Sequence, residues 1–226
     1  MNAIEDSIPY YDRVNNLISF GKAQLARSYA IGRLELQDNS IILDSGIGPG
    51  TTSSLILSMV KPRMLVGLDG SVKQLEAAKT QLSQFDSGLL NLVRGSFEYL
   101  PFRDRIFDGI ITCYALRDSL NLQQSLSEYA RVCATAGAFA DVDIGKPDGG
   151  LRRCGSALYV KYLMPILAKV AILRKMKGNP WRMIVPTYVL LPRTSALMRQ
   201  VERHFLKTEL KEFIMGGIIV IIGRKS

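Results

Sequence analysis

Short apolar runs alternate with longer stretches of helical periodicity through the first two thirds of the chain, and this alternation restricts the fold more than any other feature. Runs rich in aliphatic residues predict five strands, at residues 40–45, 63–68, 90–93, 107–113 and 138–142. Helical spacing predicts helices between them, at residues 51–59, 71–85 and 123–132. Because strands that alternate with helices form βαβ units, we expect an α/β fold with a mainly parallel sheet.

The pattern changes after residues 147–150. Two helices are predicted next, at residues 151–176 with a break at Pro165 and at residues 195–205. Two closing strands, 206–213 and 218–222, are joined through Gly216 and Gly217 and predict an antiparallel edge. The expected fold is therefore a seven-stranded, mainly parallel sheet with a helical insertion before its last two strands.

The length of 226 residues fits one α/β domain, 1–226, because domains usually run about 100–200 residues. Within it we expect residues 1–36 to form an N-terminal helical cover. The insertion at residues 145–205 is the natural place for a substrate cap.

Composition excludes several classes of protein. The N-terminus is acidic rather than a signal peptide, and the most apolar stretches, 157–173 and 216–223, are interrupted by lysines or too short to span a bilayer. The three cysteines, Cys113, Cys133 and Cys154, lack metal-ligand spacing, so no metal site is expected. A cytoplasmic protein is the resulting prediction.

Charge is distributed unevenly along the chain. Residues 1–144 contain 13 Lys or Arg against 16 Asp or Glu, whereas residues 145–226 contain 16 against 4. The last third is therefore the basic part of a chain whose net charge is +9.

A glycine-rich turn follows the first predicted strand, with the pattern G-x-G-x-G at Gly46, Gly48 and Gly50 directly after Asp44. Glycines in such a turn let the backbone bend sharply and approach a ligand closely. A nicotinamide or flavin site needs G-x-G-x-x-G, and position 51 is Thr51. The spacing therefore favours a different nucleoside-containing cofactor.

Asp69 ends the second predicted strand, where a carboxylate can accept hydrogen bonds from both hydroxyls of a ribose. Gly70 follows it at the same edge. The alternative is that Asp69 only helps to cap the helix that begins near Ser71.

Four further segments resemble one family. Residues 8–15 are similar to its N-terminal Y-D-x-x-N element, residues 114–118 to F-G-L-R-N, residues 143–147 to E-F-S-K-P and residues 216–220 to T-G-G-I-V. Together with the glycine turn, these four segments resemble the class I S-adenosylmethionine-dependent methyltransferases. Within that class, the chain resembles the ubiquinone/menaquinone biosynthesis C-methyltransferases.

This resemblance implies a Rossmann-like fold and S-adenosylmethionine as cofactor. It also implies the cofactor-binding residues Tyr11, Asp44, Gly46, Gly48, Gly50, Asp69, Gly70, Ser96, Phe97 and Tyr114. The chain departs from the family at three positions: Ser96 replaces the aspartate of G-D-A-E, Asp118 replaces an asparagine, and Ile47 stands where a cysteine or similar residue is usual.

Methyl transfer from a sulfonium is an in-line displacement, so the protein mainly aligns the reactants and excludes water. Tyr11 is expected to cover the cofactor, since an aromatic face suits a cation; the alternative is an aromatic contact with the core.

With a hydroxylated ring as acceptor, Asp118 would accept the phenolic proton and Arg117 would stabilise the oxyanion. The alternative for Arg117 and Asp118 is a surface ion pair.

The leading function is C-methylation of a quinone precursor or a similar lipophilic ring. Methylation of another small molecule or lipid, methylation of RNA, and cofactor binding without catalysis stay open. No base-stacking or groove-reading motif accompanies the basic residues, so nucleic acid is not the expected partner. Instead, the basic, apolar stretch containing Lys161, Lys169, Arg174, Lys175 and Lys177 predicts transient contact with anionic membranes at the inner membrane surface. A homodimer is a further expectation.

Overall fold

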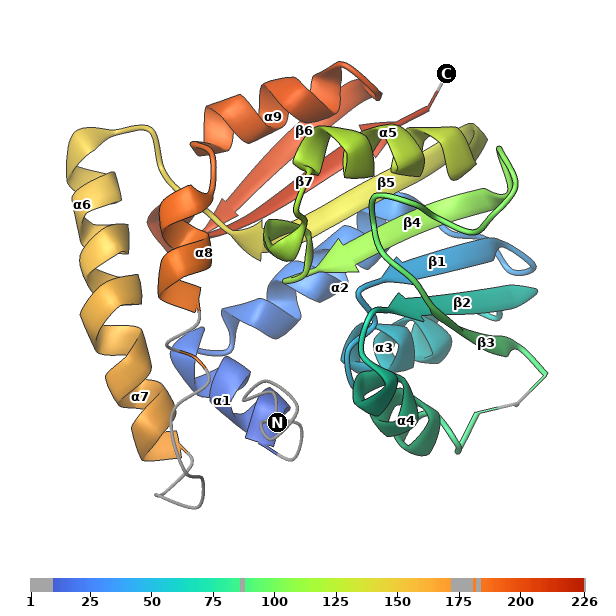
Figure 1. Cartoon of the computed structure of the whole chain (residues 1–226), viewed down its shortest axis with the longest axis horizontal. Helices are drawn as coiled ribbons and strands as arrows, with labels where there is room; N and C mark the ends of the chain where they lie inside the picture. The colour runs from blue at the N-terminus through green and yellow to red at the C-terminus, as the bar shows by residue number, and fades with distance from the viewer. Residues whose placement is uncertain (1–9, 86–87, 172–180, 182–183, 226) are drawn as a thin grey trace.

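The computed structural model describes residues 10–85, 88–171, 181 and 184–225. Its sheet has seven strands in the order β3-β2-β1-β4-β5-β7-β6 (Figure 1). The strands are β1 Ile41–Ser45, β2 Met64–Asp69, β3 Leu90–Arg94, β4 Phe107–Cys113, β5 Cys133–Ile144, β6 Leu206–Phe213 and β7 Ile218–Arg224. Strands β1 to β5 are parallel, and β7 pairs antiparallel with both β5 and β6. The predicted fold class is confirmed, including the antiparallel edge.

Helices cover both faces of this sheet. They are α1 Tyr11–Ile18, α2 Lys22–Leu34, α3 Thr51–Met59, α4 Val72–Gln81, α5 Leu122–Val132, α6 Gly150–Leu158, α7 Met164–Ala171, α8 Ile184–Leu190 and α9 Thr194–Glu202. Helices α5 and α9 lie on one face, and α2 and α3 lie on the other (Figure 1). Within the described residues, none of the helices combines the length and apolar character needed to cross a membrane.

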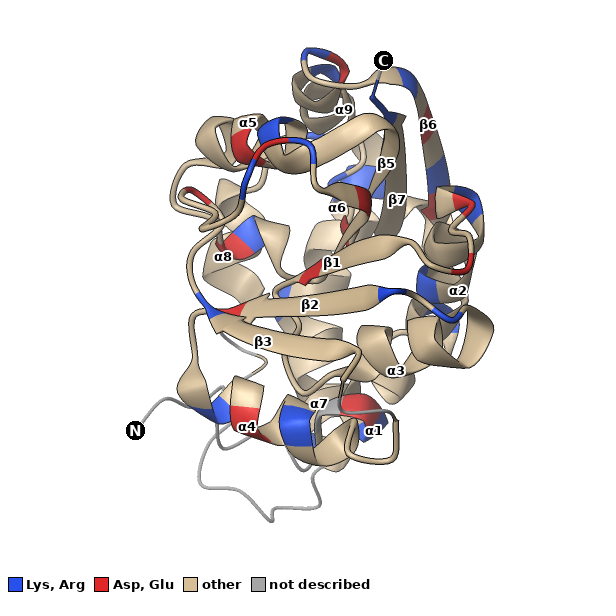
Figure 2. Cartoon of the chain, turned by 90° about the vertical axis from the view of Figure 1, so that its right-hand side faces the viewer, with Lys and Arg blue, Asp and Glu red and all other residues tan. Residues whose placement is uncertain are grey.

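Alternation along the strands builds two cores. Leu43 and Ile110 point to the face under α5 and α9, and their neighbours Ile42 and Ile111 point to the face under α2 and α3. Burial on both sides explains why these strands are continuous apolar runs in the sequence. Figure 2 shows that most charged residues lie on helices, loops and strand ends.

The predicted helix 151–176 has a different internal structure. It runs as α6, one wide π-helical turn over Tyr159–Leu163 and then α7, so the irregular turn comes just before Pro165. Proline has no N–H and its ring clashes with the carbonyl four residues earlier, which accounts for a widened turn at this place. Residues 172–176 lie outside the described part of the chain.

Other boundaries differ from the prediction by a few residues, and one helix was not predicted. Strand β5 begins at Cys133 instead of residue 138, with a register shift opposite β4, and α4 ends at Gln81 instead of residue 85. Helix α8 contains Pro186. A proline is tolerated in the first turn of a helix, but in a sequence it is read as a helix breaker, so α8 was missed.

Candidate functional site

The glycine turn joins β1 to α3 at the carboxyl edge of the sheet. Gly46, Gly48 and Gly50 have φ angles of +78°, +54° and +95°, which side chains disfavour. A Cβ atom at Gly46 would lie 2.3 Å from the Cβ of Ala115, whereas a Cβ at Gly48 would meet nothing within 4 Å. Gly46 is therefore required by packing, and Gly48 borders open space. Such a bare backbone beside open space fits a cofactor cradle.

Asp69 reaches back from the end of β2 to this turn. Its Oδ2 accepts a hydrogen bond from the N–H of Gly48 at 2.9 Å, and its Oδ1 accepts one from the N–H of Ser71 at 2.9 Å. Burial raises the pKa of Asp69, and these backbone donors oppose that rise. Ser71 is the N-cap of α4, accepting from Gln74. The structure thus brings Asp69 to the turn and also shows its contact with the start of α4.

Asp44 lies buried below the turn. One carboxylate oxygen accepts a hydrogen bond from Ser53 Oγ at 2.6 Å, and the other has no hydrogen-bond partner among the described residues. Burial raises the pKa of Asp44 to about 6. A buried acceptor without a partner is costly, so it fits a ligand that brings a donor such as an ammonium group.

Phe97 closes one side of the turn. A Cβ at Gly46 would lie 3.4 Å from the Phe97 ring, whereas Ser96 is exposed. The next residue, Glu98, is buried and accepts hydrogen bonds from Ser119 Oγ at 2.9 Å and the Leu120 N–H at 2.8 Å. Glu98 therefore anchors the segment after β4, a role that was not predicted because its donors are more than twenty residues away in the chain.

Tyr114 follows β4 with a φ of +58°, and its N–H donates to the carbonyl of Val142 at 2.6 Å. The guanidinium of Arg27, from α2, lies 5.0 Å from the centre of the Tyr114 ring. Tyr114 thus connects the carboxyl end of β4 with the N-terminal helices.

Arg117 is held mainly by a residue that was not predicted to contact it. Its Nη1 donates to Asp143 Oδ1 at 2.9 Å, and its backbone N–H donates to Asp143 Oδ2 at 3.1 Å. Asp143, near the end of β5, is 1% exposed, so this is a buried ion pair. Asp118, the partner of Arg117 in the alternative of a surface ion pair, lies 3.9 Å from Arg117 Nε, and its side chain is 47% exposed. Burial raises the pKa of Asp118, while Arg117 opposes the rise.

A second buried carboxylate lies two residues before Asp143. Asp141 is fully buried, and neither of its side-chain oxygens has a hydrogen-bond partner among the described residues. Burial raises its pKa well above the ordinary value, and the nearby Asp143 adds to the rise. The folded protein therefore holds the proton of Asp141 to a higher pH than the unfolded chain does.

The N-terminal helices approach the turn from the other side. Asp12, in the first turn of α1, accepts a hydrogen bond at 2.8 Å from the hydroxyl of Thr51, the first residue of α3. Tyr11 begins α1, but its side chain lies outside the described part of the structure, as do residues 8 and 9 of the similar N-terminal element.

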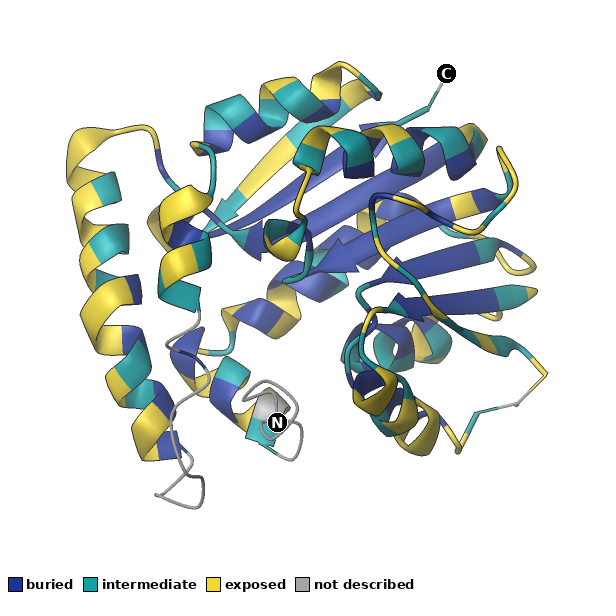
Figure 3. Cartoon of the chain, in the orientation of Figure 1, coloured by how far each residue is buried: buried dark blue, intermediate teal, exposed yellow. Residues whose placement is uncertain are grey.

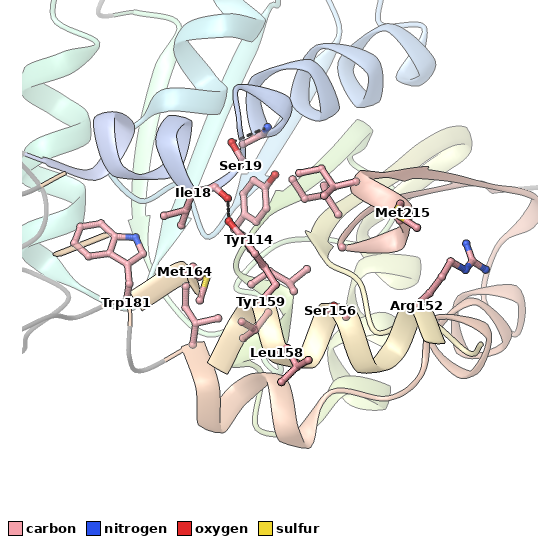
Figure 4. Close-up of a pocket in the computed structure, with 18 of the residues that line it drawn as sticks. Ile18, Ser19, Tyr114, Arg152, Ser156, Leu158, Tyr159, Met164, Trp181 and Met215 are labelled. Carbon is pink, nitrogen blue, oxygen red and sulfur yellow. Dashed lines mark hydrogen bonds between the residues drawn. The ribbon is translucent and has the colours of Figure 1, made fainter. Parts of the chain in front are cut away.

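An apolar cavity of about 590 Å³ adjoins these groups (Figure 4). Tyr114 and Arg117 line its inner side, and α1, α6, α7, α8 and the turn between β6 and β7 supply the other walls. Among the lining residues are Asn15, Ser156, Tyr159, Met164, Trp181 and Met215. Such a volume suits a small ring system, with few polar groups to orient it. Asp118 is not among the lining residues.

Hydrogen bonds join the walls of this cavity. Trp181 Nε1 donates to Asn15 Oδ1 at 3.2 Å, and the hydroxyls of Tyr188 and Ser156 are 3.0 Å apart. Tyr159 donates to the carbonyl of Ile18. The bonds of Trp181 and Tyr159 connect α1 with the insertion across 166 and 141 residues of chain, and the contact between Tyr188 and Ser156 joins α8 to α6.

The strand order, the single antiparallel strand and the glycine turn together define the Rossmann-like methyltransferase fold. A SAM-dependent methyltransferase from Aquifex aeolicus shares this fold, with a TM-score of 0.64 over 98% of both chains at 13% identity. Phosphoethanolamine N-methyltransferase 2 from Haemonchus contortus, in complex with S-adenosyl-L-methionine, has a TM-score of 0.67 at 15% identity over 92% of this chain and 43% of that one.

The chain belongs to the ubiE/COQ5 methyltransferase family, whose model matches residues 2–208. It is 25% identical to a demethylmenaquinone methyltransferase from Symbiobacterium thermophilum over 95% of this chain and 88% of that protein. It is 26% identical to the ubiquinone/menaquinone biosynthesis C-methyltransferase UbiE from Syntrophotalea carbinolica over 94% of this chain and 88% of that protein. The predicted family, the predicted enzyme class and the dependence on S-adenosylmethionine are confirmed.

Proposed function

We propose that the protein transfers a methyl group from S-adenosylmethionine to a ring carbon of a quinone precursor or a similar lipophilic, hydroxylated ring. The observation that carries the proposal is the apolar cavity beside Tyr114 and Arg117, at the edge of the sheet that also bears the glycine turn. The names of the curated relatives, which include demethylmenaquinone methyltransferases, support this class of acceptor.

Residues around the turn would hold the cofactor, which supplies an electrophilic methyl group on sulfur when bound. The bare backbone at Gly48 would border it, and Gly46 and Gly50 would supply the positive φ angles that the turn needs. Asp69 would accept hydrogen bonds from its ribose with the lone pairs that Gly48 and Ser71 do not use. Further contacts are assigned to Tyr11, Asp44, Gly70, Ser96, Phe97 and Tyr114. Ser96, in place of an aspartate, offers a hydrogen bond without a charge.

On the acceptor side, Arg117 lines the cavity and is held in place by Asp143. Its positive charge stabilises the oxyanion of the ring by a charge-assisted hydrogen bond. Asp118 takes the phenolic proton through water, and the raised pKa of its carboxyl makes it a stronger base. Loss of that proton would raise the electron density on the adjacent ring carbon and prepare it to accept a methyl group, and the hydrogen on that carbon would leave afterwards as a proton.

Residues 1–36 serve as the cover of the site and residues 145–205 as the substrate cap within one domain, 1–226. Contacts between the two segments support these roles, because residues of both line the cavity. Exclusion of water by such a cap favours a displacement reaction.

The cellular setting proposed for the enzyme is the cytoplasm, with transient binding to anionic membranes at the inner membrane surface. Lys161 and Lys169 are exposed on the cap, and Arg174, Lys175 and Lys177 lie outside the described residues. Each cation near an anionic surface contributes about 1 kcal/mol to membrane binding.

A homodimer is proposed as well, and light scattering at several protein concentrations tests it.

Label transfer tests the proposed reaction. Purified protein is incubated with methyl-labelled S-adenosylmethionine and, separately, with quinone-containing lipid, quinone-free lipid and RNA extracts. We expect label only with the quinone fraction, on a ring carbon. Transfer to another lipid or to RNA would support a different acceptor, and binding of the cofactor with no transfer to any extract would support a non-catalytic role.

A further inference from the structure

The rod formed by α6, the π-helical turn and α7 has two different sides. Its inner side packs on α1 through Val160, Met164 and Ala168. Its outer side exposes an apolar residue at every fourth position of the sequence. We call these the outer stripe: Leu158, Tyr162, Ile166 and Val170, between 54% and 59% exposed. In Figure 3 this rod stands at the edge of the molecule, with much of its surface exposed.

The outer stripe has cations beside it and no acidic residue near it in the chain. Residues 149–201 contain ten Lys or Arg and no Asp or Glu. Lys161 and Lys169 are exposed on the same rod, and the Lys161 ammonium lies 5.2 Å from the centre of the Tyr162 ring. An exposed apolar row whose charged neighbours in the chain are all cations complements a surface that is apolar inside and anionic outside.

The stripe also reaches the rim of the apolar cavity. Leu158 belongs to both, and two other lining residues, Leu151 and Met215, are 90% and 76% exposed. Arg152, next to Leu151 and also lining the cavity, is paired with Glu212 at 2.9 Å. The rim on this side therefore presents large apolar side chains to the outside, of which Leu158 and Met215 are labelled in Figure 4.

We propose that the outer stripe is the surface by which the protein docks on an anionic lipid bilayer, with the cavity rim at Leu151, Leu158 and Met215 facing the acyl region. A lipophilic acceptor then passes from the bilayer into the cavity without crossing water. The docking is inferred from the outer stripe and the charges beside it, whereas the route of the acceptor rests on the proposed function.

A paired substitution of the stripe tests the docking. Ile166→Gln with Val170→Gln removes two exposed apolar side chains and keeps good helix formers in α7. Leu25→Gln with Met59→Gln is the matched control, since these residues are 52% and 49% exposed on α2 and α3. Flotation is measured with vesicles of phosphatidylglycerol and phosphatidylcholine, and with phosphatidylcholine alone.

We expect the wild type and the control pair to float with the anionic vesicles. Partitioning of the stripe variant should fall by about tenfold or more, because burying one aliphatic side chain is worth at least that factor. Lys161→Gln with Lys169→Gln should weaken flotation at low salt only, since salt screens this attraction. Flotation of the stripe variant equal to wild type, or an equal loss in the control pair, would overturn the proposal.

Two further measurements separate the remaining explanations. If the stripe joins two copies, light scattering will show a wild-type dimer that the stripe variant abolishes, and the bilayer assignment is then wrong. Turnover of the stripe variant should fall for a long-chain acceptor in vesicles and stay unchanged for a short-chain acceptor in water. If the wild type methylates neither acceptor, the proposed function fails, while flotation still decides the docking surface.

Discussion

Two glycines of the same turn are expected to respond differently to the same substitution. Gly46 and Gly48 both have positive φ, so an alanine at either costs about 1–2 kcal/mol of backbone strain. Only at Gly46 does the new methyl group overlap another atom, at 2.3 Å from the Cβ of Ala115. Overpacking of this kind costs about 1–3 kcal/mol more, which gives about 2–5 kcal/mol in total for Gly46→Ala.

For Gly48 the expected effect is on the cofactor. Gly48→Ala should lower the free energy of unfolding by about 1–2 kcal/mol only, because nothing lies within 4 Å of its new methyl group. The larger Gly48→Val should project into the space proposed for the cofactor and weaken its binding by tenfold or more, about 1.4 kcal/mol. Urea unfolding of the free protein and titration calorimetry with S-adenosylmethionine measure the two quantities separately.

Gly32, in the last turn of α2, is the matched control. A Cβ there also meets nothing within 4 Å, but its φ is not positive, so Gly32→Ala should stabilise by about 0.5–1 kcal/mol and leave cofactor binding unchanged. Wild-type affinity in a folded Gly48→Val protein would refute the placement of the cofactor at this turn. Equal stability of Gly46→Ala and Gly48→Ala would refute the packing argument.

Three other predictions concern carboxylates of the site. Asp69→Ala should weaken cofactor binding by about 1.5–3 kcal/mol in calorimetry, and unchanged affinity in a folded variant would remove Asp69 from the site. Asp143→Ala should lower the free energy of unfolding in urea by about 3–5 kcal/mol, because it leaves Arg117 without its buried partner. Asp118→Ala should instead lower turnover and change the free energy of unfolding by less than about 0.5 kcal/mol. A larger loss of stability in Asp118→Ala than in Asp143→Ala would contradict both assignments. Burial raises the pKa of Asp141, so the folded state keeps a proton that the unfolded state loses above about pH 4. The free energy of unfolding therefore falls as the pH rises from the unfolded-state pKa to the folded-state pKa of Asp141. Asp141→Asn should therefore gain stability relative to wild type as the pH is raised from about 4 through the folded-state pKa, and a difference that is constant with pH would show that Asp141 does not titrate abnormally.

The sequence by itself determined the strands, the antiparallel edge and the glycine turn, because each depends on local information. Alternation of apolar residues specifies which face of a strand is buried, and the φ angles of the turn require glycine. The end of β2 was also readable, so Asp69 was expected near the turn and lies there. The spacing of the glycines also argued against a nicotinamide or flavin site, because position 51 is Thr51 and not the glycine that G-x-G-x-x-G requires.

Only the tertiary structure decided which groups far apart in the chain meet. Arg117 was expected to stabilise the acceptor's oxyanion or, in the alternative, to form a surface ion pair with its neighbour Asp118, but its principal carboxylate partner is Asp143, 26 residues away. Glu98 and the cavity walls of α1 and α8 likewise depend on contacts between distant segments. A sequence pattern describes the neighbours of a residue along one helix or strand, whereas a buried ion pair or a cavity is made where several elements pack together. That packing, and not the local pattern, sets the surroundings in which each side chain works.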